Sequence, residues 1–200
     1  MYKGNSSRVI PIIIVIIVVA IAIAALVSLG RAVFMGDDTK SDAVVDTSRQ
    51  SLLDTSLGHS VRMTVRGPIV ADENFRSYQI TVDPTGRLMQ VYSGYLDSSD
   101  KVKSYGNNTK AYEELVYALD KADMLRGTQL EGDDDDIRGV CATGNVYEFD
   151  VLNDDKSVKH LWTSTCKGSK GSFRASVDQV TSLFLDQIPN SSDILRDVDL

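Results

Sequence analysis

Histidine and cysteine are scarce in this chain, and their scarcity excludes several kinds of site. The 200 residues include two histidines, His59 and His160, and two cysteines, Cys141 and Cys166. So few ligands argue against a zinc site, and without a C-x-x-C pair there is no thioredoxin-type centre. The sequence also lacks a G-x-S-x-G nucleophile motif and a phosphate-binding P-loop. We therefore expect no metal, no cofactor and no catalytic residue.

One long apolar run is present near the N-terminus. Residues 9–29 contain no charged side chain and are mostly Ile, Val, Ala and Leu. A helix of this length crosses the roughly 30 Å hydrocarbon core of a bilayer. Lys3 and Arg8 precede the run and Arg31 follows it, so the positive-inside rule places residues 1–8 in the cytoplasm. The run predicts a transmembrane helix that anchors the chain in the cell membrane, with the C-terminal part extracytoplasmic.

A cleaved signal peptide is the alternative to a retained anchor. The apolar core of a signal peptide usually has about 7 to 15 residues and precedes a cleavage site of small residues. Here the pair Ala22 and Ala24 lies inside the run rather than after it, and the run is longer. The length favours the anchor, while retention and cleavage both stay open.

Acidic residues dominate the part of the chain beyond the run. All 28 Asp and Glu follow it, whereas Lys3 and Arg8, two of the 21 basic residues, precede it. The remainder is therefore more negative than the whole chain, whose net charge is −7. Such a surface repels phosphate backbones, so nucleic acid is not an expected partner. We expect instead the membrane, through the apolar run, and a protein, peptide or glycan partner in the envelope.

The remaining sequence divides into a spacer, one domain and a tail. Residues 30–58 include a polar stretch and predict a juxtamembrane spacer. Residues 59–189 predict an extracytoplasmic domain, and residues 190–200 predict a polar C-terminal tail.

The first half of this domain has the pattern of an antiparallel meander. Apolar residues alternate over 59–67, 76–82 and 87–95, as in half-buried strands. The sequence Asp83-Pro84-Thr85-Gly86 suits a tight turn between the second and third strands. Residues 97–107 are polar and predict a loop.

Two helices and a hairpin follow. Apolar residues recur at three- and four-residue steps over 111–125, with Asn108 as N-cap and Gly127 at the C-terminal end. Ser176 and Gln179 form a capping box before a second helix. The order strand-strand-strand-helix-strand-strand-helix predicts an α+β fold, in which an antiparallel sheet of about five strands carries two helices on one face.

The predicted hairpin brings the two cysteines together. Its turn is centred between Asn153 and Asp154, and this centre places Cys141 directly opposite Cys166. In an oxidising compartment such a pair forms a disulfide, which stabilises a small domain by roughly 3 kcal/mol.

Two features suggest ligands. Tyr95 and Tyr105 flank the predicted polar loop and are the candidate residues of a sugar or peptide groove. The run Asp133–Asp136 offers carboxylates to a cation, although contiguous side chains diverge, so a solvated acidic loop is the alternative.

Two short stretches resemble known families. Thr163–Cys166 with Arg174 resembles the cysteine and arginine region of sortases, which implies that Cys166 is a nucleophile and that Arg174 stabilises an oxyanion. The N-terminal pair Lys3-Gly4 resembles the cleavage position of pilins, although Val9 stands where pilins place a Glu.

Because the sequence has a predicted membrane anchor and no recognisable catalytic motif, it predicts a non-enzymatic binding or assembly module of the cell envelope. A pilin-like filament subunit and a sortase-like cysteine transpeptidase are the alternatives.

Overall fold

The structure is a computed structural model that describes residues 47–95, 99–196 and 198. These residues belong to one compact unit, which spans Asp46–Leu200. The predicted transmembrane run 9–29 lies outside the described residues, as does most of the predicted spacer. Within the described ranges, no helix has both the length and the apolar composition needed to span a membrane.

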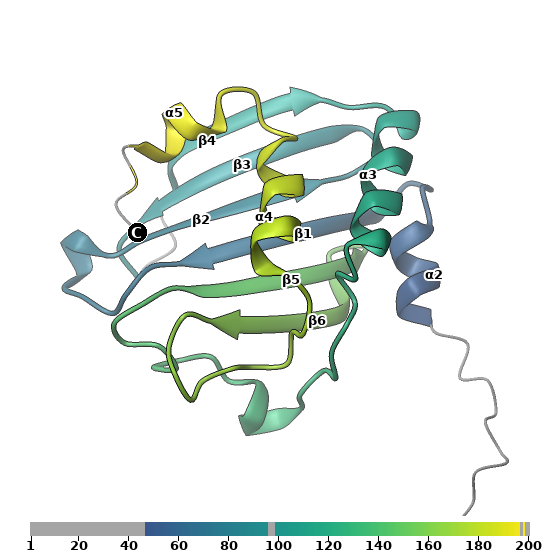
Figure 1. The fold of residues 1–200 in the computed structure, drawn as a ribbon. Helices are drawn as coiled ribbons and strands as arrows, with labels where there is room; N and C mark the ends of the chain where they lie inside the picture. The colour runs from purple at the N-terminus through teal and green to yellow at the C-terminus, as the bar shows by residue number, and fades with distance from the viewer. Residues whose placement is uncertain (1–46, 96–98, 197, 199–200) are drawn as a thin grey trace, which may run out of the picture. The chain divides into compact units, whose positions relative to one another are not determined.

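Six antiparallel strands form a single sheet, so the predicted α+β class is confirmed, with six strands in place of about five (Figure 1). The strands are β1 (His59–Arg66), β2 (Arg76–Val82), β3 (Gly86–Ser93), β4 (Ser99–Gly106), β5 (Val146–Asn153) and β6 (Lys156–Ser164). Their order across the sheet is β4-β3-β2-β1-β5-β6. The meander β1 to β4 therefore extends one side of β1, and the hairpin β5–β6 extends the other.

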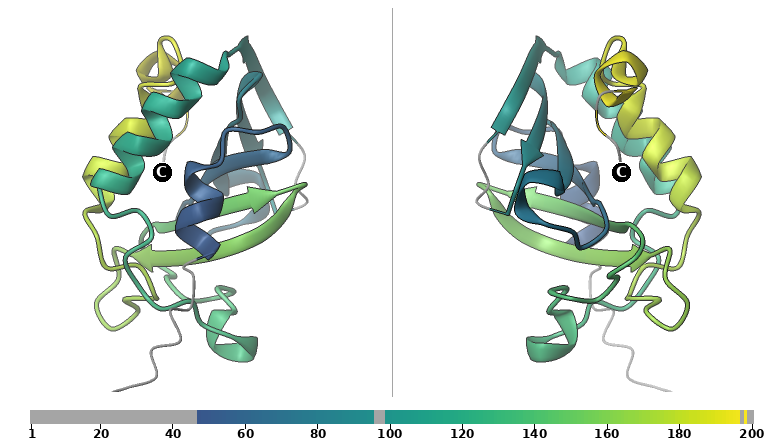
Figure 2. Two further views of the ribbon diagram at one scale, coloured as in Figure 1. Left: turned by 90° about the vertical axis from the view of Figure 1, so that its right-hand side faces the viewer. Right: turned by 90° about the vertical axis from the view of Figure 1, so that its left-hand side faces the viewer.

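The helices are α2 (Thr47–Leu53), α3 (Thr109–Lys121), α4 (Val177–Leu185) and α5 (Ser191–Arg196), with short 3₁₀ turns η1 (Asp72–Asn74) and η2 (Gly132–Asp135). Both views of Figure 2 show α3 and α4 side by side on one face of the sheet. The main core lies between these helices and the sheet. Its largest fully buried side chains include Tyr112, Phe149 and Phe184, and each such burial stabilises the fold by roughly 1.5–3 kcal/mol.

The N-terminal end of α3 agrees with the prediction, and its C-terminal end differs from it. As predicted, the Asn108 side chain caps α3, because its Oδ1 accepts a hydrogen bond from Ala111 N at 3.0 Å. However, α3 ends at Lys121, and the residue with positive φ after it is Asp123 (58°) rather than Gly127. Gly127 also has positive φ (148°), but it lies beyond the helix end, where its backbone forms an isolated antiparallel bridge with Phe173.

The predicted loop over residues 97–107 is mostly strand β4. The prediction failed because every residue of β4 except Tyr105 is exposed, so no apolar alternation marks it. An edge strand with one partner takes its regularity from β3, to which it pairs over its length.

Both ends of the folded unit extend beyond the predicted domain of residues 59–189. Helix α2 lies in the predicted spacer, yet Leu52 is fully buried in the main core, and Arg49 donates to Asp120 of α3. At the other end, Val198 is buried and Ile194 of α5 packs against the core. Described residues of the predicted tail, among them Ile194 and Val198, therefore pack on the domain.

The β5–β6 hairpin has a different register from the predicted one. Asp154 and Asp155 both have positive φ (47° and 62°), so they form a two-residue turn that twists with the flanking strands. A bulge between Val151 and Leu152 shifts the pairing further. The predicted turn centre sets His160 opposite Tyr147, whereas in the structure His160 faces Asp150. Cys141 lies outside β5, so strand pairing does not bring the cysteines together.

Candidate functional site

A disulfide closes a second, smaller apolar cluster. The predicted Cys141–Cys166 bond is present, with a Cα–Cα distance of 5.6 Å. Cys141 packs with Val146 and Trp162, and Leu130, Ile137 and Val140 lie against them. Because Trp162 alternates with Leu161 of the main core, this cluster lies on the sheet face opposite α3 and α4.

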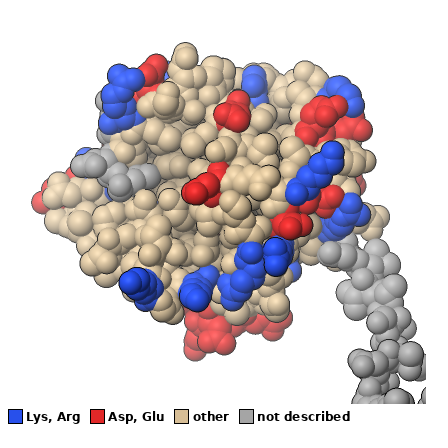
Figure 3. All heavy atoms as spheres, viewed as in Figure 1, with Lys and Arg blue, Asp and Glu red and all other residues tan. Residues whose placement is uncertain are grey.

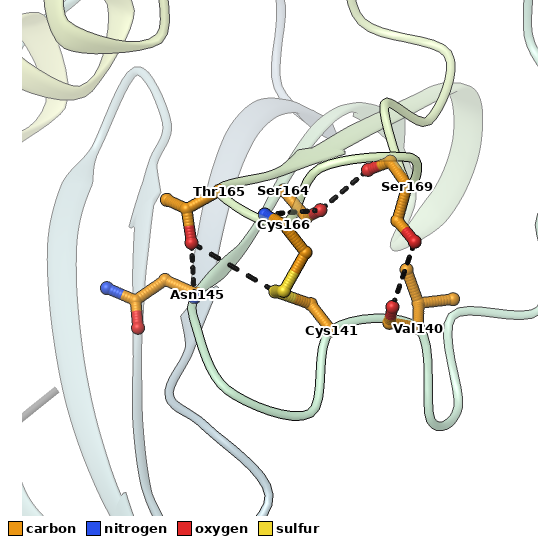
Figure 4. The surroundings of a disulfide bond; sticks show 7 residues. All are labelled: Val140, Cys141, Asn145, Ser164, Thr165, Cys166 and Ser169. Atoms are coloured by element: carbon orange, nitrogen blue, oxygen red, sulfur yellow. Dashed lines mark hydrogen bonds between the residues drawn. A yellow bond between two sulfur atoms is a disulfide. The ribbon is translucent and has the colours of Figure 1, made fainter.

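Hydrogen bonds fix the two loops that the disulfide joins (Figure 4). Ser169 Oγ donates to Val140 O at 3.0 Å, and Asn145 N donates to Thr165 Oγ1 at 3.0 Å. Gly144 permits this close approach, because a Cβ there would lie 2.2 Å from Thr165 Oγ1. The segment before β5 is thereby fixed to the segment after β6 independently of the strand ladder.

A largely apolar depression of about 420 Å³ lies beside this cluster. Residues of the segments 66–69 and 137–141 line it, together with Phe75, Tyr95 and Val146. The backbone of Ile69 is fixed at this depression by a hydrogen bond, in which Ile69 N donates to Ala142 O at 2.9 Å. Even so, Ile69 remains 47% exposed, and Tyr95 at the same depression is 44% exposed. The depression therefore offers apolar surface that the fold itself leaves uncovered.

Tyr95 is held rigidly at the margin of this depression. Its ring stacks on Phe75, with centroids 4.1 Å apart and planes 18° from parallel. Its hydroxyl donates to Val70 O at 2.9 Å and accepts from Val70 N at 3.1 Å. Its own N–H donates to Asp72 Oδ1 at 2.8 Å. A ring fixed at both ends presents its face to a ligand with little loss of conformational entropy.

The charged residues that line the depression are both arginines, Arg66 and Arg138. Arg66 Nε donates to Glu148 at 2.7 Å, and Arg138 Nε donates to Asp136 at 2.9 Å. These hydrogen bonds from Arg138 lower the pKa of Asp136 to about 2. Neither carboxylate lines the depression, so a ligand meets guanidinium groups there despite the negative charge of the chain.

A buried polar network occupies the same sheet face and was not predicted from the sequence. Asp150, which is 4% exposed, accepts from His160 Nδ1 at 2.9 Å, from Ser157 Oγ at 3.1 Å and from Arg62 Nε at 3.3 Å. The His160 Nε2 lies 4.0 Å from a carboxylate oxygen of Glu148. The register of β1, β5 and β6 places these residues together, and the predicted register had paired His160 with another residue.

The pKa shifts in this network favour its charged forms. The hydrogen bond with Asp150 raises the pKa of His160, with burial opposing and the nearby carboxylate charges adding to the rise. Burial acts to raise the pKa of Asp150, but the hydrogen bond and charge of His160 together with the charge of Arg62 lower it. Because both ring nitrogens of His160 face carboxylates, the imidazolium form is stabilised and neither nitrogen is presented as a base.

The structure separates the two tyrosines proposed for a groove. Tyr95 lines the depression beside the disulfide, whereas Tyr105 lies near the far end of β4 and lines a different groove with Pro189 and Ile194. Within the described residues, no group of three or more His, Cys, Asp or Glu side chains is placed to hold a metal ion. The run Asp133–Asp136 falls in and just after η2, where Asp136 is engaged by Arg138.

The sortase-like arrangement lacks a free thiol, because the Cys166 sulfur is bonded to Cys141. Arg174 Nη1 donates to the backbone oxygens of Phe173 and Lys170 at 2.8 and 3.3 Å, a structural role. Comparison of the chain with protein-family models, curated proteins and solved structures found no match.

Proposed function

We propose that this protein is a non-enzymatic binding module of the cell envelope, held at the membrane by residues 9–29. The depression beside the disulfide is its binding site. Its partner is a peptide segment that carries a large apolar side chain next to a carboxylate. One observation carries the proposal: an exposed apolar surface whose charged lining residues are Arg66 and Arg138, on a chain that is otherwise acidic.

Size and chemistry support this partner. A volume of about 420 Å³ is within the range of small-ligand sites and takes one aromatic or branched side chain with its neighbours. Tyr95 and Ile69 supply apolar contact, and guanidinium groups pair with carboxylates in a planar, directional way. The Cys141–Cys166 disulfide and the charge distribution around residues 9–29 support an extracytoplasmic location.

The binding proposal is tested with the full chain in lipid nanodiscs. The probe is a fluorescein-labelled peptide with a Phe-Glu pair between glycines, and its Phe-Gln analogue is the charge control. We expect fluorescence polarisation to show binding of the Phe-Glu peptide and weaker binding of the analogue. Ile69→Ser is expected to weaken binding about tenfold, since it removes apolar contact at the site.

Leu57→Ser is the matched control, because Leu57 is 78% exposed and does not line the depression. Equal binding by the Ile69 and Leu57 variants, or no discrimination between the two peptides, would refute the proposed site. The location is tested separately with a reporter fused after Leu200, and activity of a cytoplasm-specific reporter there would contradict the topology.

A further inference from the structure

Glu148 lies between the proposed binding site and His160. It belongs to β5, the middle strand of the neighbours β1, β5 and β6, and it faces Thr64 on one side and Trp162 on the other. Arg66 of β1 and His160 of β6 are therefore its diagonal neighbours, within reach of long side chains. One carboxylate is thus placed between a guanidinium and an imidazole, on the sheet face opposite α3 and α4.

The two carboxylate oxygens of Glu148 face different partners. Oε1 accepts from Arg66 Nε at 2.7 Å, and Oε2 lies 4.0 Å from His160 Nε2. Glu148 is 8% exposed, so little water screens its charge from either neighbour. No other hydrogen bond joins the Arg66 guanidinium to a described residue. Because Arg66 lines the depression, its remaining N–H groups are available to a ligand carboxylate.

The other charged groups around His160 come from β1, β5 and η2. Asp150 of β5 accepts from His160 Nδ1 at 2.9 Å and also from Arg62 of β1 at 3.3 Å. Asp135 of η2 adds a further carboxylate charge. The hydrogen bond with Asp150 raises the pKa of His160, burial opposes the rise, and the charges of Asp150, Glu148 and Asp135 add to it. The imidazolium is therefore the form that these carboxylates favour.

This local group of charges, rather than the surface as a whole, sets the potential at the depression. Figure 3 shows acidic and basic side chains interspersed over the helix-bearing face, so no large field of one sign arises there. Exposed charges are screened over about 8 Å at physiological ionic strength, whereas buried charges are screened much less. One charge gained or lost at His160 therefore changes the potential at Arg66 more than a distant exposed charge does.

We propose that His160 is a specificity-determining residue of the binding site, because its protonation state sets how strongly Arg66 holds a ligand carboxylate. When His160 is an imidazolium, its charge offsets that of Glu148, and the charge of Arg66 is left for the ligand. When His160 is neutral, Glu148 offsets Arg66 instead, and the ligand meets one positive charge fewer. This inference rests on the function proposed above, and it makes the preference for an acidic peptide stronger at lower pH.

Proton binding and peptide binding are linked, so each reports on the other. If protonation of His160 strengthens binding by a given factor, a bound carboxylate raises the pKa of His160 by the logarithm of that factor. For one charge acting across two side chains under partial screening, we expect a factor of about five. The corresponding rise in the pKa of His160 is about 0.7.

The test uses the full chain in nanodiscs of zwitterionic lipid with the Phe-Glu and Phe-Gln peptides. Both peptides have blocked termini and a rhodamine label, whose emission does not depend on pH in this range. We expect the ratio of their affinities, Phe-Glu over Phe-Gln, to be about fivefold larger at pH 5.5 than at pH 9. The peptide carboxylate is ionised at both values. A change in the stability of the domain would affect both peptides alike, so the ratio isolates the charge.

His160→Gln is expected to make this ratio independent of pH and equal to its wild-type value at pH 9, because glutamine carries no charge. His59→Gln is the matched control. It removes the other histidine of the chain, which is at the opposite end of β1 from Arg66, and should leave the pH dependence intact.

Nuclear magnetic resonance measures the linked quantity in the unaltered protein. Only two histidines contribute imidazole signals, and His59→Gln assigns them. Saturation with the Phe-Glu peptide should raise the pKa of His160 by about 0.7, and the Phe-Gln peptide should leave it unchanged. This measurement stands even if His160→Gln impairs folding.

The outcomes separate this inference from the proposed function. Absence of Phe-Glu binding at both pH values would refute the proposed site and the role of His160 with it. Binding with the same affinity ratio at pH 5.5 and pH 9 would overturn the role of His160 alone and leave the binding site in place. A pKa of His160 that is unchanged in the saturated complex, or equal effects of the His160 and His59 variants, would do the same.

Discussion

Removing the disulfide is expected to destabilise the domain substantially. Cys141 and Cys166 are 25 residues apart in sequence. In the chain-entropy description, closing a loop of this size lowers the entropy of the unfolded chain by the equivalent of about 3.5 kcal/mol at 25 °C. For a unit of this size, each kcal/mol shifts the midpoint of thermal unfolding by about 2–4 °C. The double variant Cys141→Ala, Cys166→Ala should therefore unfold about 7–14 °C below the wild type.

The position of Trp162 provides a local measurement of the same change. It is the only tryptophan of the chain and packs on Cys141 in the small cluster. Its fluorescence reports on this cluster, and far-ultraviolet circular dichroism reports on the whole sheet and helices. We expect the Trp162 emission to shift to longer wavelength below the temperature at which the circular dichroism signal is lost, because the loops joined by the disulfide lie outside the main core.

Reduced wild-type protein is the control, since it loses the bond but keeps both side chains. It should match the double variant within about 1 kcal/mol, because only a small packing change separates the two. A midpoint that falls by less than about 2 °C in both samples would refute the loop-entropy reasoning. A reductant that further destabilises the double variant would show that it acts elsewhere.

Three further outcomes follow from single residues. Because the folded-state pKa of His160 is raised from 6.5, its pairing with Asp150 stabilises the fold below that value and ceases to do so as pH rises through the folded pKa. His160→Gln should therefore lose more stability, by urea unfolding, at pH 5.5 than at pH 9, and a pH-independent loss would contradict this assignment. Gly127→Ala should cost more than about 1 kcal/mol, since its Cβ would lie 2.1 Å from Ser172 O at a φ of 148°, whereas Gly106→Ala meets nothing within 4 Å and is the control. Asn108→Ala should cost about 1 kcal/mol through the lost cap, with Asn108→Asp retaining most of the stability, and equal losses in the two variants would exclude capping as the cause.

Elements with strong local signals were predicted closely. The strands over 59–66 and 76–82 agree with the predicted ranges to within one residue, because core residues such as Val61, Met63 and Tyr78 alternate with polar residues along each strand. The sequence signal was weak where an element is exposed on both faces, as in β4, or where a few residues dock at a chain end, as in α5. For these elements the regularity comes from a neighbouring strand or from the core, and neither appears in a local window of sequence.

The disulfide was predicted correctly, but for a reason that the structure does not support. Its presence followed from the count of two cysteines, but the register argument offered for it was wrong, because a two-residue turn at Asp154–Asp155 and a bulge shift the hairpin. The cysteines meet because the segment before β5 folds back over Trp162. The depression was likewise invisible in the sequence, apart from Tyr95, since its walls come from segments about 70 residues apart, at Ile69 and Arg138.

By itself, the sequence determined the mixed α+β class, the core faces of the central strands, the capped helices and the acidic character, because periodicity, capping and charge are local or additive properties. Tertiary structure alone decided which strands lie at the edges of the sheet, where the apolar depression lies and how His160 meets Asp150. These features depend on strand order and register, which are set by the competition of all segments for one buried surface. A one-residue shift in register moves every side chain of a strand to the other face.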